Sequence, residues 1–168
     1  MSVVNLMNKV PAPILAGILK KMDLKFSDLK NVGFSFVNFG GAAGTTVTSM
    51  NSRNHDILGY HINIDETITK DKKYTRYGGF YGTLVHELQH LKQSLSGRHV
   101  PDTRDENFAF WDDKRYPTED SIRRNSRSWG MSEDAAFVMY RNLPWELDAD
   151  AVSERVISEL VAEGIVTL

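Results

Sequence analysis

The stretch Thr83-Leu84-Val85-His86-Glu87-Leu88-Gln89-His90-Leu91-Lys92-Gln93 contains the pattern H-E-x-x-H. On an α-helix, His86 and His90 lie one turn apart on the same face. Two imidazoles at this spacing can bind one metal ion, and Glu87 lies beside them, where it can hold a water molecule on that ion. The pattern therefore predicts a metal site built on a helix.

The residues around this motif predict a helix without reference to any metal. Leucines recur at the spacing of one apolar helix face, at Leu84, Leu88, Leu91 and Leu95. At about 100° per residue, this face points almost opposite to the two histidines. Gly97 follows at a position suited to ending the helix. We therefore expect one side of the helix to pack into the core while the other side lines a cleft.

The composition limits both the class of protein and the chemistry of the site. The chain has 168 residues and a net charge of -2, which favours one domain (1–168) and gives no reason to expect a nucleic-acid or membrane partner. It contains no cysteine, so His and carboxylate side chains must hold any metal. Residues 1–8 lack the positive charge of a secretory signal, and no apolar run could span a membrane, so a cytoplasmic protein is expected.

Apolar patterns before the motif predict a helix and three strands, at 13–24, 32–39, 45–50 and 57–64. We expect the strands to form an antiparallel meander with turns at 40–44 and 51–54. The strand at 57–64 comes last before the motif helix, so we expect it to be the edge on which an extended peptide could add. His55 and His61 are expected to be surface or turn histidines rather than metal ligands.

After the motif, the segment 98–128 is polar, lacks a clean periodicity and is long for a loop. It is interpreted either as a wall or lid of a cleft, with a short helix near 108–111, or as an ordinary surface excursion. Two helices are predicted beyond it. The first covers 132–142 with Ser132 as its N-cap, and the second covers 144–163 and ends at Gly164.

The two histidines need a third ligand, because a catalytic zinc usually has three protein ligands and one open position. The layout H-E-x-x-H-x-x-G-x-x-H would supply it from the same helix, but this chain has Gln93 and Ser96 where that layout has Gly and His. A later helix offers a carboxylate in the stretch Pro144-Trp145-Glu146-Leu147-Asp148-Ala149-Asp150. There, Glu146 and Asp150 lie one turn apart on one face.

Small residues continue this face at Ala149 and Ser153, so the later helix could pack closely against the motif helix. Asp150 would then be placed to accept a hydrogen bond from a ligating histidine. Glu146 could instead be an acid favoured by the helix dipole, without any metal. Other candidates for the third ligand are Glu106, Glu119 and Glu133. Of the neighbouring residues, Trp145 and Leu147 are expected in the core and Asp148 is expected to be exposed.

H-E-x-x-H on one helix and E-x-x-x-D on a later helix together resemble the gluzincin metallopeptidases, of which thermolysin is the best known. The resemblance covers the two helices and, loosely, the strand before the first of them. It implies that His86, His90 and Glu146 bind zinc, that Glu87 is the general base, and that Asp150 orients His86. Thermolysin-like enzymes also use a downstream histidine to stabilise the transition state, and this chain has no histidine after position 99. The candidates for that role are Tyr116, Tyr140, Arg141 and His99.

The expected fold is α+β: a minimal zincin-like domain with a small, mostly antiparallel sheet packed against the motif helix and the later ligand-bearing helix. The expected function is zinc-dependent hydrolysis of peptide bonds, with a peptide or protein as the substrate and Glu87 moving the proton. Two alternatives remain. One is a binding module that uses a metal only for stability, against which the presence of Glu87 argues. The other is a zinc amidase that acts on a non-protein amide.

Overall fold

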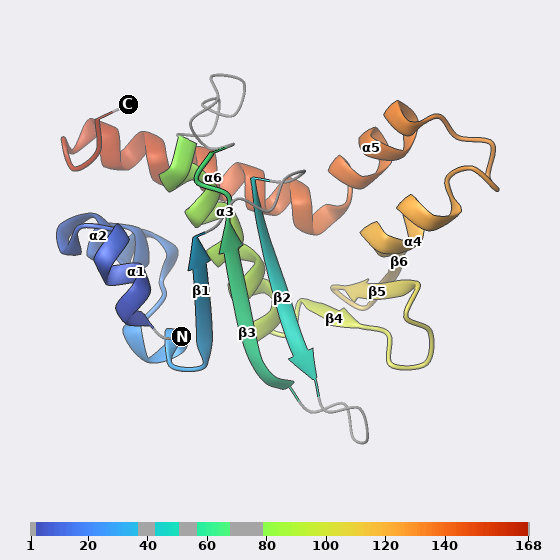
Figure 1. Cartoon of the computed structure of the whole chain (residues 1–168), viewed down its shortest axis with the longest axis horizontal. Coiled ribbons are helices and arrows are strands. Elements are labelled where there is room, and N and C mark those ends of the chain that lie inside the picture. Colours follow the sequence, from blue (N-terminus) through green and yellow to red (C-terminus); the bar gives the residue numbers. More distant parts are fainter. Residues whose placement is uncertain (1–2, 37–42, 51–56, 68–78, 168) are drawn as a thin grey trace.

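A computed structural model describes residues 3–36, 43–50, 57–67 and 79–167 (Figure 1). The helices in these ranges are α1 (Val3–Lys9), α2 (Ala12–Met22), the short 3-10 helix η1 (Phe26–Leu29), α3 (Gly79–Leu95), α4 (Glu119–Asn125), α5 (Glu133–Arg141) and α6 (Pro144–Ala162). The strands are β1 (Val32–Phe36), β2 (Gly44–Met50), β3 (Ile57–Ile64), β4 (His99–Pro101), β5 (Phe108–Trp111) and β6 (Lys114–Pro117). The predicted α+β class is confirmed.

Several predictions of the sequence fall outside the described residues: most of the turn at 40–44, the turn at 51–54, and His55. Among the helices that are described, none combines the length and apolar character needed to cross a membrane. The helix α1 was not predicted, because its seven residues are too few to display a helical period.

The first sheet has the strand order β1-β3-β2, so the predicted antiparallel meander is wrong. Strand β3 lies in the centre, parallel to β1 and antiparallel to β2. Its side chains explain this order, because Ile62 and Ile64 are fully buried while β2 consists largely of threonine, serine and glycine. A polar strand tolerates the edge of a sheet better than an apolar one. The expectation that 57–64 is an edge strand is therefore also wrong, and β2 is the edge on that side.

The main core lies between this sheet and the helices α2, α3 and α6. Leu84, Leu88 and Leu91 of α3 are fully buried in it, against side chains that include Phe34 and Ile62 of the sheet. Leu95, the last leucine of the predicted stripe, is 47% exposed because α3 ends there. Gly97 follows with a left-handed φ of 73°, as expected for a residue that stops a helix.

Helix α6 packs directly against α3, as its small residues predicted (Figure 1). Ala149 and Ser153 are fully buried, and the Ser153 hydroxyl donates a hydrogen bond of 2.8 Å to the carbonyl of Gly82 on α3. The helix ends close to the predicted position, with Gly164 in the left-handed region. This close approach brings the N-terminal turn of α6 to the histidine face of α3.

The polar segment 98–128 is not an irregular loop, because it folds into a second antiparallel sheet with the order β4-β5-β6, followed by α4. The predicted short helix at 108–111 is strand β5. Its residues alternate between half-buried and buried, and it is joined to β6 by Asp112 and Asp113, both with positive φ. Two consecutive residues of this kind form the tight turn of a hairpin. A second hydrophobic cluster, separate from the main core, includes Ala109, Trp111, Ile122, Ala136, Leu143 and Trp145.

Candidate metal centre

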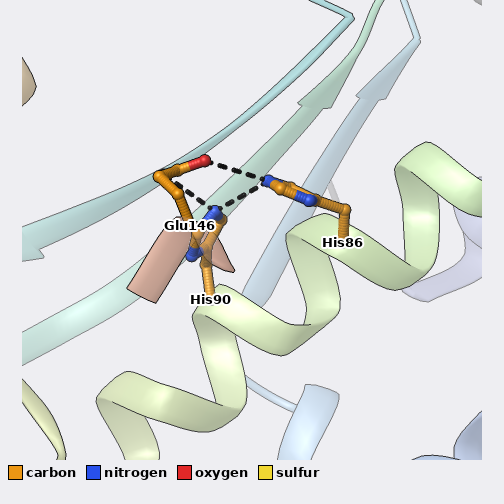
Figure 2. A group of neighbouring side chains, drawn as sticks. All are labelled: His86, His90 and Glu146. Carbon is orange, nitrogen blue, oxygen red and sulfur yellow. Dashed lines mark hydrogen bonds and ion pairs between the residues drawn. The ribbon is translucent and has the colours of Figure 1, made fainter. Parts of the chain in front are cut away.

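Three of the predicted site residues meet where α3 faces the start of α6 (Figure 2). The Nε2 atoms of His86 and His90 are 3.0 Å apart. The carboxylate of Glu146 reaches both, with Oε2 3.4 Å from Nε2 of His86 and Oε1 3.3 Å from Nε2 of His90. Their side chains are largely buried, so three potential ligand atoms converge on one point inside the protein.

These distances fit a tetrahedral metal ion. Bonds of about 2.0–2.1 Å, typical of His and carboxylate ligands, separate two ligand atoms in a tetrahedron by about 3.3 Å. The three observed separations of 3.0, 3.3 and 3.4 Å lie close to this value. Among the described residues, this is the group of His and acidic side chains that could hold a metal ion. The arrangement therefore fits a metal held by two nitrogens and one carboxylate.

The second nitrogen of each histidine has its own oxygen acceptor. Nδ1 of His86 lies 3.1 Å from Oδ1 of Asp150, and Nδ1 of His90 lies 2.9 Å from Oε1 of Gln93. When each Nδ1–H donates to its oxygen, the Nε2 lone pair is left free and directed at the shared point. Asp150 thus lies where the sequence placed it, beside His86. The partner of His90 was not foreseen.

Gln93 is held so that its oxygen, not its nitrogen, faces His90. Its Nε2 donates to the carbonyl of Trp145 and to Oδ2 of Asp148, both at 2.9 Å. Gln89 donates to the same carboxylate oxygen at 2.7 Å. Asp148 is therefore not the exposed acid that was expected, because the two buried glutamines of α3 require an acceptor from α6. A Gln three residues after a ligating histidine was the available signal for this contact.

The two residues that flank Glu146 in the sequence, Trp145 and Leu147, differ in burial. Trp145 is 5% exposed and belongs to the second hydrophobic cluster, as expected for a core residue. Leu147 is 50% exposed, so its expected place in the core is wrong. Its side chain therefore lies at the surface of the protein.

The carboxylates around the histidines favour positive charge at this point. Burial lowers the pKa of His86, but hydrogen bonds with Asp150 and Glu146 outweigh burial and raise it to about 9. The pKa of His90 is also raised, because the hydrogen bond and charge of Glu146 overcome its burial. In return, the two histidines hold the pKa of the buried Glu146 well below its usual range. A divalent cation supplies the positive charge that these acids require.

Glu87 is nearly fully buried and does not belong to the ligand group. Its Oε2 accepts a hydrogen bond of 2.8 Å from the hydroxyl of Thr46 on β2. Burial raises the pKa of Glu87, although the charges of His90 and His86 and the bond from Thr46 oppose the shift. Gly44 gives this carboxylate room, because a Cβ atom there would lie 2.6 Å from Oε1 of Glu87. No pattern in the sequence indicated that β2 contacts Glu87.

Of the four candidates for stabilising a transition state, Tyr140 and Arg141 lie next to Glu146. Arg141 pairs with Glu146 at 3.5 Å and with Asp150, so its charge is already shared between two carboxylates. Burial raises the pKa of Tyr140, and the charge of Glu146 and a hydrogen bond with it raise that pKa further. The tyrosine therefore stays protonated at neutral pH and can donate a hydrogen bond.

The other two candidates, His99 and Tyr116, lie against Trp145. The His99 ring is stacked on the indole, with centroids 4.4 Å apart, and Tyr116 meets it edge-on at 6.1 Å. Burial, together with the charge of His90, lowers the pKa of His99 to about 4, so this histidine is neutral at pH 7. Both residues thus support the indole that precedes Glu146 in the chain.

The other histidine that the structure describes, His61, and the competing acids do not belong to the ligand group. His61 contacts the hydroxyl of Ser35 at 2.8 Å on the sheet. Glu106 is exposed and pairs with Arg124 at 3.3 Å, and Glu133 is exposed at the start of α5. Burial raises the pKa of Glu119, and the charges of Glu146 and Glu87 contribute to this shift. Of the three competing acids, Glu119 is therefore the one whose pKa is affected by the charges of the centre.

Comparisons of the chain with protein-family models, with curated proteins and with solved structures give no match.

The hydrogen bond between Asp150 and His86 leads to a prediction about metal affinity. Asp150→Asn keeps every ligand atom but replaces a charged acceptor by a neutral one, so we expect about a 10–100-fold loss of metal affinity. Competition with a chromogenic chelator measures this. Asp112→Asn is the matched control, because Asp112 is also paired with an arginine, Arg98, but lies on the β5–β6 hairpin. Equal affinities of both variants would contradict an orienting role for Asp150.

Proposed function

We propose that this protein is a zinc-dependent metallopeptidase of the gluzincin type. The observation that carries this proposal is the convergence of His86, His90 and Glu146 on one point, with the buried carboxylate of Glu87 beside them but outside the ligand group. Two histidines and one carboxylate are a ligand set typical of catalytic zinc, which keeps a fourth position open. Asp150 on His86 and Gln93 on His90 add the outer hydrogen bonds that such ligands usually make.

In this proposal, Glu87 moves the proton. A zinc ion held by His86, His90 and Glu146 would lower the pKa of a bound water to about 7 and polarise the scissile carbonyl. Glu87 would take a proton from the attacking water and pass it to the leaving amine. Its raised pKa suits the first step, because a carboxylate with an ordinary glutamate pKa is a weaker base and would take the proton less readily. The Thr46 hydroxyl holds the carboxylate in position. When its hydroxyl turns away from Glu146, Tyr140 can donate a hydrogen bond to the oxygen that becomes negative during attack.

The substrate backbone would pair with β2. This strand borders the sheet on the side of Glu87, and β3 is its partner in the sheet. An extended peptide can add to such an edge through main-chain hydrogen bonds, which position it without reading its sequence. Strand β2 thus takes the role that was expected for 57–64.

A chelator experiment tests the proposal. Protein purified without chelator is expected to contain zinc at about one ion per chain by elemental analysis, and to cleave members of a mixed peptide library. Treatment with 1,10-phenanthroline should stop cleavage, and added zinc should restore it. Zinc without cleavage would favour the metal-stabilised binding module. Cleavage of non-protein amides but not of peptides would favour the amidase. Absence of zinc, with no uptake on titration, would contradict the metal centre itself.

A further inference from the structure

A pocket of about 510 Å³ lies between α4 and α5, in the part of the chain that follows the second sheet. The two helices are consecutive in the chain and pack against each other. On one side lie Glu119, Ile122 and Arg123 of α4, together with Arg127 in the turn that follows the helix. The α5 side contributes Glu133, Ala136, Phe137 and Tyr140. Its volume lies within the range of about 300–1,000 Å³ that is usual for ligand pockets. We call it the α4–α5 groove.

One end of the groove borders the metal centre. Tyr140 lines the groove and also interacts with Glu146. The next residue, Arg141, pairs with Glu146. The groove residues Ile122 and Ala136 belong to the same hydrophobic cluster as Trp145, the residue before Glu146. Tyr140 is therefore shared between the groove and the surroundings of Glu146, which places the groove next to the centre.

Part of the groove lining is apolar, and it leaves a large aromatic side chain in contact with water. Ile122 is 1% exposed and Ala136 is 9% exposed, whereas Phe137 is 63% exposed. Exposed aromatic surface in a concave site is a frequent mark of a ligand contact. The neighbouring Val138 is also exposed but does not line the groove. Of these two exposed side chains, only Phe137 is therefore available to a ligand in the groove.

The groove also carries more positive than negative side chains. Arg123, Arg124 and Arg127 line it, against two acids, Glu119 and Glu133. Arg123 and Arg124 form exposed ion pairs with Asp120 and Glu106, and such pairs contribute little and exchange easily. Arg127 has no ion-pair partner among the residues that the structure describes. A ligand with a carboxylate would complement these arginines.

We propose that the α4–α5 groove binds the part of a peptide substrate next to the scissile bond, and that it selects a large apolar side chain followed by a carboxylate. This inference rests on the proposed peptidase function, because it makes the groove a specificity site of the same centre. The carboxylate can belong to an acidic side chain or to the C-terminus of the peptide, since arginine recognises both in the same way. The experiment separates these two sources.

The test measures binding separately from cleavage. Matched fluorescent peptides carry Phe or Ala at one position, Glu or Lys at the next, and either a free C-terminal carboxylate or an amide. Their affinities for the Glu87→Gln protein are measured by fluorescence anisotropy, and their kcat/KM values are measured with the parent. We expect the Phe peptides to be favoured over the Ala peptides by about 10–200-fold, the range that apolar pockets achieve. We expect a further preference of about tenfold for a carboxylate.

Two groove variants and two matched controls locate the effect. Phe137→Ala should reduce the preference for Phe, and Val138→Ala, the adjacent exposed apolar residue, should leave it intact. Arg127→Glu should abolish the preference for a carboxylate, and Arg104→Glu, at another exposed arginine, should not. All four positions are exposed, so the fold should tolerate each change. If the lost preference is for Glu over Lys, the carboxylate is a side chain, and if it is for the free C-terminus over the amide, it is terminal.

The outcomes distinguish the groove from the peptidase function. Cleavage with selectivity that no groove variant changes would overturn the groove proposal and leave the function standing. Selective binding that is lost in both groove variants, without cleavage of any peptide by the parent, would overturn the function and leave the groove standing. Equal affinity for all peptides, or equal effects of variants and controls, would also overturn the groove proposal.

Discussion

Glu146→Ala is expected to abolish tight zinc binding. The substitution removes one of three protein ligands, so the loss should exceed the factor of about 10–100 that follows from removing an outer hydrogen-bond partner such as Asp150. It also leaves His86 and His90 without the buried carboxylate that both contact. Affinities of the parent, Glu146→Ala and Asp150→Asn are measured by competition with a chromogenic chelator. We expect the parent to bind zinc most tightly, Asp150→Asn to bind it less tightly, and Glu146→Ala to bind it most weakly.

Alanine substitutions of the competing acids, Glu106, Glu119 and Glu133, serve as controls for this order. Glu119→Ala is the strictest of them. The charges of Glu146 and Glu87 affect the pKa of Glu119, but Glu119 does not belong to the ligand group. It should bind zinc about as well as the parent. If Glu146→Ala bound zinc like the parent while Glu119→Ala lost it, the assignment of the third ligand would be wrong.

The parts of the site that could be predicted from the sequence are those fixed by helix geometry. The spacing of His86 and His90 and the spacing of Glu146 and Asp150 each determine which side chains share a face. The leucine stripe on one helix and the small residues on the other determine which faces are buried. Two helices described in this way can pack with their polar faces together, and the structure brings the four side chains together accordingly.

The parts that could not be predicted depend on contacts between distant segments. The order of the first sheet follows from the relative burial of β2 and β3, and alternation within a single strand does not reveal its neighbours. The bond from Thr46 to Glu87 requires that order, so it was missed as well. Asp148 looked like any acid in a first helical turn, because the two glutamines that bind it lie 55 and 59 positions away. Strand β5 has only four residues, too few to establish a period of two.

Glu87→Gln is expected to keep both the fold and the zinc while reducing hydrolysis by about 10²–10⁴-fold, the range for loss of a general base. Glutamine has nearly the shape of glutamate, and its oxygen can still accept the hydrogen bond from Thr46. It cannot take a proton from water at neutral pH. Because burial already opposes the charged form of Glu87, the neutral side chain should not lower the melting temperature.

Three measurements on one preparation make this result specific: kcat/KM on a peptide that the parent cleaves, zinc content, and thermal unfolding. Glu154→Gln, the same chemical change at an exposed position of α6, is the matched control and should behave like the parent in all three. Loss of zinc together with activity would mean that Glu87 supports the metal rather than the proton transfer. Unchanged kcat/KM would show that another group is the base. Loss of activity alone, with zinc and melting temperature retained, is the result that the buried carboxylate beside the ligands predicts.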